Sequence, residues 1–517
     1  MATWDDGYVT DVVYTHASYR EMTPLWLATT ALLLGHRPPD LSRPFRYADL
    51  GCGHGLTATI VAATCPHAEV WGFDFNPAHI ENARRLAEAA GLANLHFKEA
   101  SFAELAERPP LDPGSFDFVV SHGVASWISV ENRGCLTGLI GQWLRPGGLA
   151  YLSYNVATGW ASMQPVRALM LMLMRSRQER SDQAAAGLMD YLETLKEAKA
   201  GFLTANPIAG QRLTEIRKHD PRYLAHEFLN ADWHPLMFAD VAAAMQDAKC
   251  SYIGSATLTE NLDAVSLPPG MTALVTEATD PVLRETLRDF GLAKGFRRDV
   301  FRRGLLPVPV PEQVRLIDGI ELVWSGRQPE DPIKLTTPIG EVQGIPEIYT
   351  PMMARLMAGN CTVGEIRQDP ALARRPVTDV LQAVVLLIAG GYAQPALPEA
   401  VQVLGRASVA RLNAAIGEVN ADGGNIALLA GATTGSEVAA DPLETLLVRE
   451  KLSGRPMEID GLTDRVLAAL TRAGRSVQRD GKPITDFAES RAMVRGSLVG
   501  IIGQRLSVLA RLGAVPA

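Results

Sequence analysis

The sequence has 517 residues, of which 47% are hydrophobic and 21% are charged. This is the composition of a globular protein, and a chain of this length is expected to form roughly two to four domains. The formal net charge of −8 argues against a nucleic-acid partner, and the five cysteines, which form no C-x-x-C pair, argue against a disulfide framework or a zinc site.

The first chemical signal follows the short stretch at residues 45–48, at the end of a predicted strand. It reads Asp49-Leu50-Gly51-Cys52-Gly53-His54-Gly55, an acid followed by glycine at every second position. Glycine has no Cβ, so a ligand can lie against the main chain. The dinucleotide-binding fingerprint would place a third glycine where this sequence has Leu56. The pattern instead resembles the first motif of class I S-adenosylmethionine-dependent methyltransferases. The alternative is a strand-to-helix turn that holds no ligand.

A second strand, Glu69–Asp74, also ends in an acid. Asn76 and Pro77 then provide an N-cap and a first-turn proline for a helix that stops at Gly91. A carboxylate at the end of the second strand lies where a nucleotide ribose presents its hydroxyls. Because ligands sit beyond the carboxyl ends of parallel strands, we expect Asp74 to face the same cleft as the glycine loop. The alternative is that Asp74 only caps the helix.

The remaining elements continue the alternation of strand and helix. Strands are predicted at 95–100, 116–123 and 149–155, with a helix over about 131–144 before the last of them. After an inserted segment, the sheet resumes with a helix at 238–248 and strands at 252–258 and 296–301. This order predicts an α/β fold with a doubly wound, seven-stranded, Rossmann-like sheet and a helical insertion.

We divide the chain into a core at 1–160, a helical insertion at 161–235, a region at 236–304 that completes the sheet, a module at 312–400 and a C-terminal helical region at 401–517. The segment Pro307–Pro311 is expected to be a semi-rigid linker. The insertion contains an apolar helix near 166–174, which predicts a lid or a dimer interface.

The part of the chain beyond the linker is expected to be α+β. Three short helical patterns and a turn at 390–396 give the module at 312–400 a winged-helix-like outline. The third helical pattern is too apolar to face phosphate, so a protein-packing module is favoured over DNA binding.

Several stretches together resemble bacterial methyltransferases that carry a methyltransferase regulatory domain. They are Tyr14-Thr15-His16, Ser121–Trp127, Ser153–Asn155, Gly159-Trp160, Tyr223–Glu227, Tyr252–Leu258, Phe296–Asp299 and Asn413–Gly435. The resemblance covers nearly the whole chain and implies the cofactor S-adenosyl-L-methionine. Characterised members of the family are dimeric protein-lysine methyltransferases that act on a bacterial outer-membrane protein.

The resemblance also implies a cofactor site built from the glycine loop and the ends of the next strands. Its residues are Tyr14, Asp49, Gly51, Cys52, Gly53, Gly55, Asp74, Phe75, Ser101, Phe102, His122 and Gly123. The sequence departs from the family pattern at Ala100, where an acid is frequent beside the adenine, and at Ala125, where an aromatic residue is frequent near the acceptor.

Methyl transfer needs few catalytic groups, because the sulfonium already activates the methyl group and the protein mainly aligns donor and acceptor. A lysine acceptor must become neutral, which an aromatic-lined channel beside the sulfonium would favour. We expect Trp127, Tyr154 and Trp160 to build this channel, and His122 or His226 to accept the proton. The alternative for each of these residues is a structural role in the core.

The sequence also indicates where the protein is located and what it binds. The longest apolar run, near Val380–Ala389, is about half the length that a bilayer requires, and the N-terminus, with Asp5 and Asp6, does not resemble a signal peptide. We therefore expect a cytoplasmic homodimer with no bound metal, no membrane insertion and a protein acceptor. The alternatives are a small metabolite or a glycan or lipid intermediate as acceptor, or a scaffold that binds the cofactor without turnover.

Overall fold

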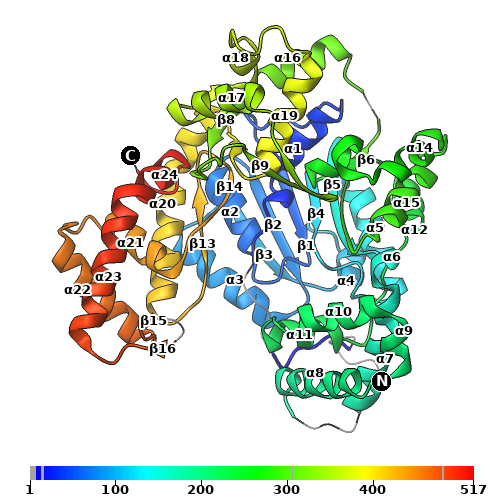
Figure 1. The fold of residues 1–517 in the computed structure, drawn as a ribbon, viewed down its shortest axis with the longest axis horizontal. Coiled ribbons are helices and arrows are strands. Elements are labelled where there is room, and N and C mark those ends of the chain that lie inside the picture. Colours follow the sequence, from blue (N-terminus) through cyan, green and yellow to red (C-terminus); the bar gives the residue numbers. More distant parts are fainter. Residues whose placement is uncertain are drawn as a thin grey trace.

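The computed structural model describes residues 7–12, 17–175, 177, 179–305, 307–479 and 482–516. At its centre is a seven-stranded sheet with the strand order β3-β2-β1-β4-β5-β7-β6 (Figure 1). All neighbouring strands are parallel except β7, which runs antiparallel to both β5 and β6. The strands are β1 (Arg46–Leu50), β2 (Glu69–Asp74), β3 (Leu95–Glu99), β4 (Phe116–Ser121), β5 (Leu144–Asn155), β6 (Cys250–Ser255) and β7 (Phe296–Arg303). The predicted seven-stranded Rossmann-like sheet is confirmed.

Helices cover both faces of the sheet. One face packs against α1 (Pro24–Leu33), α2 (Leu56–Thr64) and α3 (Pro77–Ala89), and the other against α4 (Phe102–Glu107), α5 (Val130–Trp143) and α12 (Phe238–Asp247). Local sequence sets where these helices begin. The Asn76 side chain accepts a hydrogen bond from the Ala78 N–H, and Ser101 and Glu104 form a reciprocal capping box. The capped first turns of α3 and α4 therefore determine where the loops after β2 and β3 end.

The helical insertion forms its own small core. Its elements are α6 (Ala157–Trp160), η2 (Ala161–Met163), α7 (Gln164–Met174), α8 (Ser181–Glu197), α9 (Gly201–Ala205), α10 (Pro207–Ile216) and α11 (Pro221–Phe228). The apolar face of α7 packs inside this core, and Met170 is fully buried there. The apolar sequence of α7 is therefore explained within one chain, which corrects our reason for expecting a subunit interface at this helix.

Four short helices between β6 and β7 were not predicted from the sequence. They are η3 (Leu258–Asn261), α13 (Asp263–Ser266), α14 (Pro269–Glu277) and α15 (Pro281–Leu292). The predicted sixth strand ends at Ser255, earlier than expected, because the Asn261 side chain accepts a hydrogen bond from the Ser255 N–H and donates one to the Ser255 carbonyl. These bonds close a turn just after the strand.

The proline run at 307–311 is not the expected linker. The Val308 N–H donates to the Gly35 carbonyl at 2.8 Å, and α16 (Val310–Asp318) begins inside the run and packs on α1. The elements that follow are β8 (Glu321–Trp324), β9 (Lys334–Thr337), β10 (Gly340–Gln343), α17 (Pro346–Ala358), β11 (Cys361–Thr362), α18 (Val363–Arg367), α19 (Val377–Ala389) and β12 (Ala393–Pro395). The three predicted helices are present. The segment at 390–396, however, contains one strand, which pairs with β8, so the winged-helix outline is not confirmed.

The last part of the chain packs directly on the sheet-covering helices (Figure 1). It consists of α20 (Glu399–Ala421), β13 (Leu428–Gly431), β14 (Ser436–Ala439), α21 (Pro442–Leu452), α22 (Ile459–Arg472), β15 (Gln478–Arg479), β16 (Lys482–Pro483), α23 (Phe487–Gly500), the π-helical turn η4 (Ile501–Arg505) and α24 (Leu506–Arg511). The Ser408 hydroxyl on α20 donates to the Ala63 carbonyl of α2 at 2.6 Å. A Cβ on Gly405 would lie 2.6 Å from the Thr64 carbonyl oxygen, so only glycine permits this close approach.

No helix within the described ranges is both long and apolar enough to cross a bilayer.

Candidate functional site

A cavity of about 720 Å³ opens at the carboxyl ends of the central parallel strands. Ten of the residues assigned to the cofactor from the sequence line it: Asp49, Gly51, Cys52, Gly53, Asp74, Phe75, Ser101, Phe102, His122 and Gly123. Tyr14 lies outside the described residues. Gly55 is not among the lining residues, and its role is different from the one we expected.

The glycine loop divides into a part that faces the cavity and a part that packs behind it. Gly53 has φ +54°, and a Cβ there would meet no atom of the described residues within 4 Å. A Cβ on Gly55 would lie 2.4 Å from the Phe97 ring. Gly53 therefore leaves room for a ligand, whereas Gly55 lets α2 pack closely against β3.

Asp74 holds the loop in place and also faces the cavity. Its Oδ2 accepts a hydrogen bond from the Gly53 N–H at 2.9 Å, and its Oδ1 accepts one from the Asn76 N–H at 2.9 Å and contacts His79 Nδ1 at 3.2 Å. A carboxylate has about four acceptor positions, so one stays available for a ligand hydroxyl. The helix-capping alternative and the ligand-binding interpretation of Asp74 are thus compatible.

Asp49 is the most unusual acid of the cavity. Its side chain is 2% exposed, and its Oδ1 has no hydrogen-bond partner in the described part of the chain. Burial, and secondarily the nearby Asp74, raise the pKa of Asp49 to about 8. A buried acid without a cationic partner suits a positively charged ligand. S-adenosylmethionine, which carries an ammonium and a sulfonium, fits this site.

His122 lies on the floor of the cavity, as predicted. Its Nδ1 is 2.8 Å from the Tyr151 hydroxyl, and its ring stacks on Tyr19 with the centroids 3.6 Å apart. Burial, and secondarily Arg298, lower the pKa of His122 to about 3, so the ring is neutral at physiological pH.

The residues expected around the acceptor divide into two groups. Trp127, Trp160 and His226 line the cavity, and the Trp160 Nε1–H donates to the Gly295 carbonyl at 2.8 Å. The expectation for Tyr154 is wrong. Side chains alternate along β5, so Asn155 lines the cavity while Tyr154 points to the other face, where its hydroxyl donates to Asp299 Oδ2 at 2.6 Å.

Sequence reasoning missed several residues of the cavity. Tyr223 and Glu227 line it from α11, Tyr8 and Tyr19 from the N-terminal segment, and Arg298 from β7. Burial raises the pKa of Glu227 to about 7, partly opposed by a hydrogen bond from Tyr223. The positions 223, 226 and 227 all line the cavity and follow helical spacing, a signal in the sequence that marks one face of α11, and position 230 lines the cavity just beyond the helix.

No group of three or more metal-ligating side chains occurs among the residues that the structure describes.

Comparisons with known proteins agree with this geometry. A family model described as "Methyltransferase domain" matches residues 48–148, and one described as "Predicted methyltransferase regulatory domain" matches residues 220–303. The chain is 34% identical over 511 residues to an uncharacterized Synechocystis protein, sll1526, with 99% of each chain covered. Over 148 residues, it is 29% identical to trans-aconitate 2-methyltransferase of Methylobacterium nodulans, which is 29% of this chain and 48% of that enzyme.

A solved structure shows the same fold over the whole chain. The structure of PKMT2 from Rickettsia typhi in complex with AdoHcy matches with a TM-score of 0.71 and 19% identity, over 97% of this chain and 100% of PKMT2. The chain belongs to the class I S-adenosylmethionine-dependent methyltransferases that carry a methyltransferase regulatory domain, and its cofactor is S-adenosyl-L-methionine.

Proposed function

We propose that this methyltransferase N-methylates lysine side chains of a protein acceptor. The observation that carries the proposal is the lining of the cavity beyond the glycine loop. Glu227 lies there together with the rings of Trp127, Trp160 and Tyr223. An acid among aromatic rings suits an alkylammonium, because the carboxylate attracts the charge and the rings pack against the methylene chain.

The cofactor, when bound, supplies an activated methyl group. Asp49 would hold its positive charge, Asp74 its ribose hydroxyls, and the main chain at Gly51, Gly53 and Gly123 would allow its close approach. Phe75, Ser101 and Phe102 line the same end of the cavity and would enclose the adenine. Cys52 lines the loop as a small spacer, because burial raises the pKa of its thiol well above the ordinary value.

We assign proton removal from the lysine ammonium to Glu227. Its pKa of about 7 is closer to that of an amine than the pKa of an ordinary carboxyl. The two histidines are weaker proton acceptors, since burial lowers the pKa of His122 to about 3 and that of His226 to about 4. His226 instead has an anchoring contact, with Nε2 3.0 Å from the Val12 carbonyl. The proposal thus shifts the base from His122 or His226, the residues expected from the sequence, to Glu227.

A small anionic metabolite is the second candidate acceptor. Arg298 lines the cavity, and its Nε is buried without a hydrogen-bond partner in the described residues. An unpaired guanidinium nitrogen suits a carboxylate. The core of the chain is also similar to trans-aconitate 2-methyltransferases, although over less than half of those enzymes.

The test is to incubate the purified protein with methyl-labelled cofactor and a lysate of the host, and then to locate the label. We expect label on lysine residues of protein, strongly reduced by Glu227→Gln. Glu193→Gln, on α8 of the same insertion, is the matched control and should leave labelling unchanged. Label found only in small molecules would replace the lysine proposal with the metabolite one.

The assembly and location belong to the same proposal. We propose a homodimer, as the family resemblance implies, and a location in the cytoplasm, as expected from the N-terminal sequence and the short apolar runs. Light scattering of the full chain at micromolar concentration and fractionation of the host test these two statements.

A further inference from the structure

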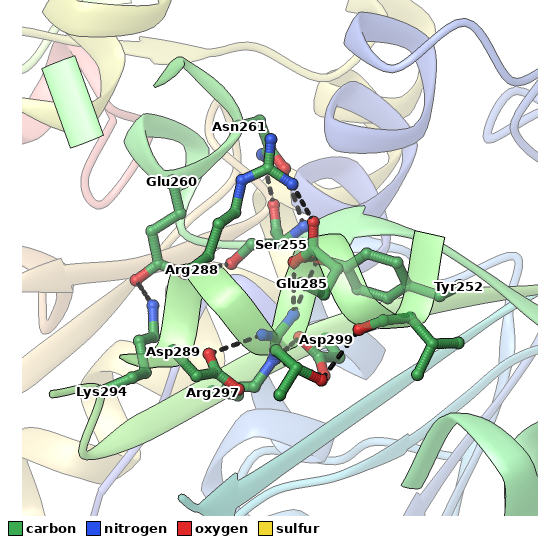
Figure 2. Close-up of polar contacts among 12 residues, drawn as sticks. Tyr252, Ser255, Glu260, Asn261, Glu285, Arg288, Asp289, Lys294, Arg297 and Asp299 are labelled. Atoms are coloured by element: carbon green, nitrogen blue, oxygen red, sulfur yellow. Dashed lines mark hydrogen bonds and ion pairs between the residues drawn. The ribbon is translucent and has the colours of Figure 1, made fainter. Parts of the chain in front are cut away.

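A second cavity, of about 200 Å³, lies within the segment between β6 and β7. Ser255, Ser266, Glu285, Arg288, Asp289 and Lys294 are among its lining residues. Figure 2 shows five of these side chains, from β6, α15 and the turn before β7, gathered around the Arg297 guanidinium. The cavity is separate from the cofactor cavity, since no residue lines both.

The charged side chains in and around this cavity form ion pairs, but the cluster contains more carboxylates than cations. Arg297 binds Glu285, Asp289 and Asp299 at 2.8–2.9 Å. Two further cations complete the cluster: Arg288 pairs with Asp263 and Glu285, and Lys294 pairs with Glu260. The cluster as a whole contains five carboxylates and three cations, and three of each line the cavity, while Asp263 and Asp299 lie outside its lining. Burial raises the pKa of Asp289 and raises that of Asp299 to about 6, in both cases opposed by Arg297.

Two buried polar atoms at this cavity lack partners. Asp289 is 1% exposed and Ser266 is 2% exposed. Asp289 Oδ1 accepts from Arg297, but neither Asp289 Oδ2 nor Ser266 Oγ has a hydrogen-bond partner among the residues that the structure places. A buried carboxylate oxygen without a donor is unfavourable, so this pair of atoms marks a place where a ligand would supply hydrogen bonds.

We propose that the second cavity binds a small organic cation whose ammonium donates to Asp289 Oδ2 and whose neighbouring polar group bonds Ser266 Oγ. A cation offsets the excess of carboxylates, and an ammonium supplies the missing donors. The space suffices, because a cavity of about 150 Å³ in an engineered protein core accommodates benzene.

The site lies directly behind the wall of the large cavity. The Thr158 hydroxyl is within hydrogen-bond distance of the carbonyls of Asp289 and Lys294, at 3.3 and 3.2 Å, and Trp160 donates to the next residue, Gly295. Arg297 and Arg298 are neighbours on β7 and point to the second and the large cavity respectively. An occupant of the second cavity would thus contact the segment that holds Trp160 at the acceptor.

Isothermal titration of the full-length protein with ethanolamine tests the proposal. Ethanolamine carries an ammonium beside a hydroxyl, and ethylene glycol is its neutral control. Saturating S-adenosylhomocysteine and the Glu227→Gln variant exclude binding in the large cavity. We expect one ethanolamine per chain with a dissociation constant of about 1 mM or tighter, and no binding of ethylene glycol.

Two variants locate the site. Asp289→Asn keeps the acceptor for Arg297 but places a donor where the ammonium binds, and should weaken ethanolamine binding about tenfold or more. Ser266→Ala removes only the unpartnered hydroxyl, so the fold should be intact and the affinity a few-fold lower. Asp318→Asn, which weakens a distant pair with Arg367, is the control.

Three outcomes would overturn the proposal. They are the absence of ethanolamine binding to the parent protein at about 10 mM, equal binding of ethylene glycol, and unchanged affinity in both folded variants.

Discussion

The Glu437 carboxylate of β14 accepts a hydrogen bond from the backbone N–H of Arg20 at 2.8 Å. Its second oxygen accepts one from the Ser18 hydroxyl at 3.2 Å. Between these two anchors lies Tyr19, whose ring stacks on His122 in the cofactor cavity. A residue far along the chain, in the predicted C-terminal helical region at 401–517, therefore holds the N-terminal segment against the active site.

We expect Glu437→Ala to weaken S-adenosylmethionine binding. The change removes both acceptors and leaves the Arg20 N–H unpaired, which costs about 1–3 kcal/mol and, if the whole cost falls on binding, lowers the affinity roughly 5- to 150-fold. Isothermal titration measures it. Glu418→Ala, which removes an exposed pair with Arg449, is the control and should bind like the parent. An unchanged affinity in Glu437→Ala would show that the segment at 17–22 is held by other contacts.

Truncation after Gly304 is expected to destabilise the catalytic fold, although the sequence predicted a linker and separate modules beyond this residue. Helix α20 covers α2 and α3, so its removal exposes apolar residues such as Ile60 and Val61 to water. Circular dichroism on heating should show a lower melting temperature or no cooperative transition. A truncated chain that melts like the parent and binds the cofactor equally well would show that residues 1–304 fold without the rest of the chain.

Two substitutions test the cofactor cradle. Gly53→Val places a branched side chain in the cavity and forces it into a left-handed conformation, so S-adenosylmethionine binding should be abolished. Asp74→Ala removes the ribose acceptor and the anchor of the Gly53 N–H, and should cost about 1.5–3 kcal/mol of binding free energy. Titration calorimetry measures both. Parental affinity in both folded variants would place the cofactor elsewhere.

Cofactor binding is expected to release a proton from Asp49. With a pKa raised to about 8, this carboxyl is largely protonated at pH 7 in the free protein, and the positive charge of the cofactor lowers the pKa. Calorimetry at pH 7 in buffers of different ionisation enthalpy should report release of up to about one proton per cofactor. Asp49→Asn should abolish the release. Equal apparent enthalpies in all buffers for the parent would mean that the protonation of Asp49 does not change on cofactor binding, and would contradict the prediction.

The fold could be predicted well from local patterns, and the reasons are visible in the strands. Strands β2 and β4 are short, largely apolar runs that end at Asp74 and Ser121, and together with the glycine loop after β1 they sufficed to place the first five strands along the chain. Of the helices between β6 and β7, α14 carries little hydrophobic periodicity. The sequence of α15 is amphipathic, a signal that we did not use, and its position depends on the ion pairs of Glu285 and Asp289 with Arg297.

The residues of the site could be predicted only where a local sequence motif marks them. The residues at strand ends lie together because the topology requires it. Tyr154 was wrong because its neighbour Asn155, with the opposite pleat direction, faces the cavity. Glu227 shares one face of α11 with His226, a local signal that we did not use. Glu437 depends on a contact between segments distant in the sequence, and no local pattern reports such a contact.

The last prediction concerns Glu227 and the pH dependence of stability. Its pKa is about 7 in the folded protein against the ordinary 4.5, so the fold favours the protonated form. The stability that this preference contributes is fully present below about pH 4.5 and is lost as the pH rises through about 7. The amide introduced by Glu227→Gln stays neutral at every pH. The melting temperature of the variant should therefore rise relative to that of the parent as the pH goes from about 5 to 8. Glu193→Gln is the control, and its difference from the parent should not change with pH. A difference between Glu227→Gln and the parent that does not change with pH would show that Glu227 is ionised in the folded protein at neutral pH, and would remove it as the proposed base.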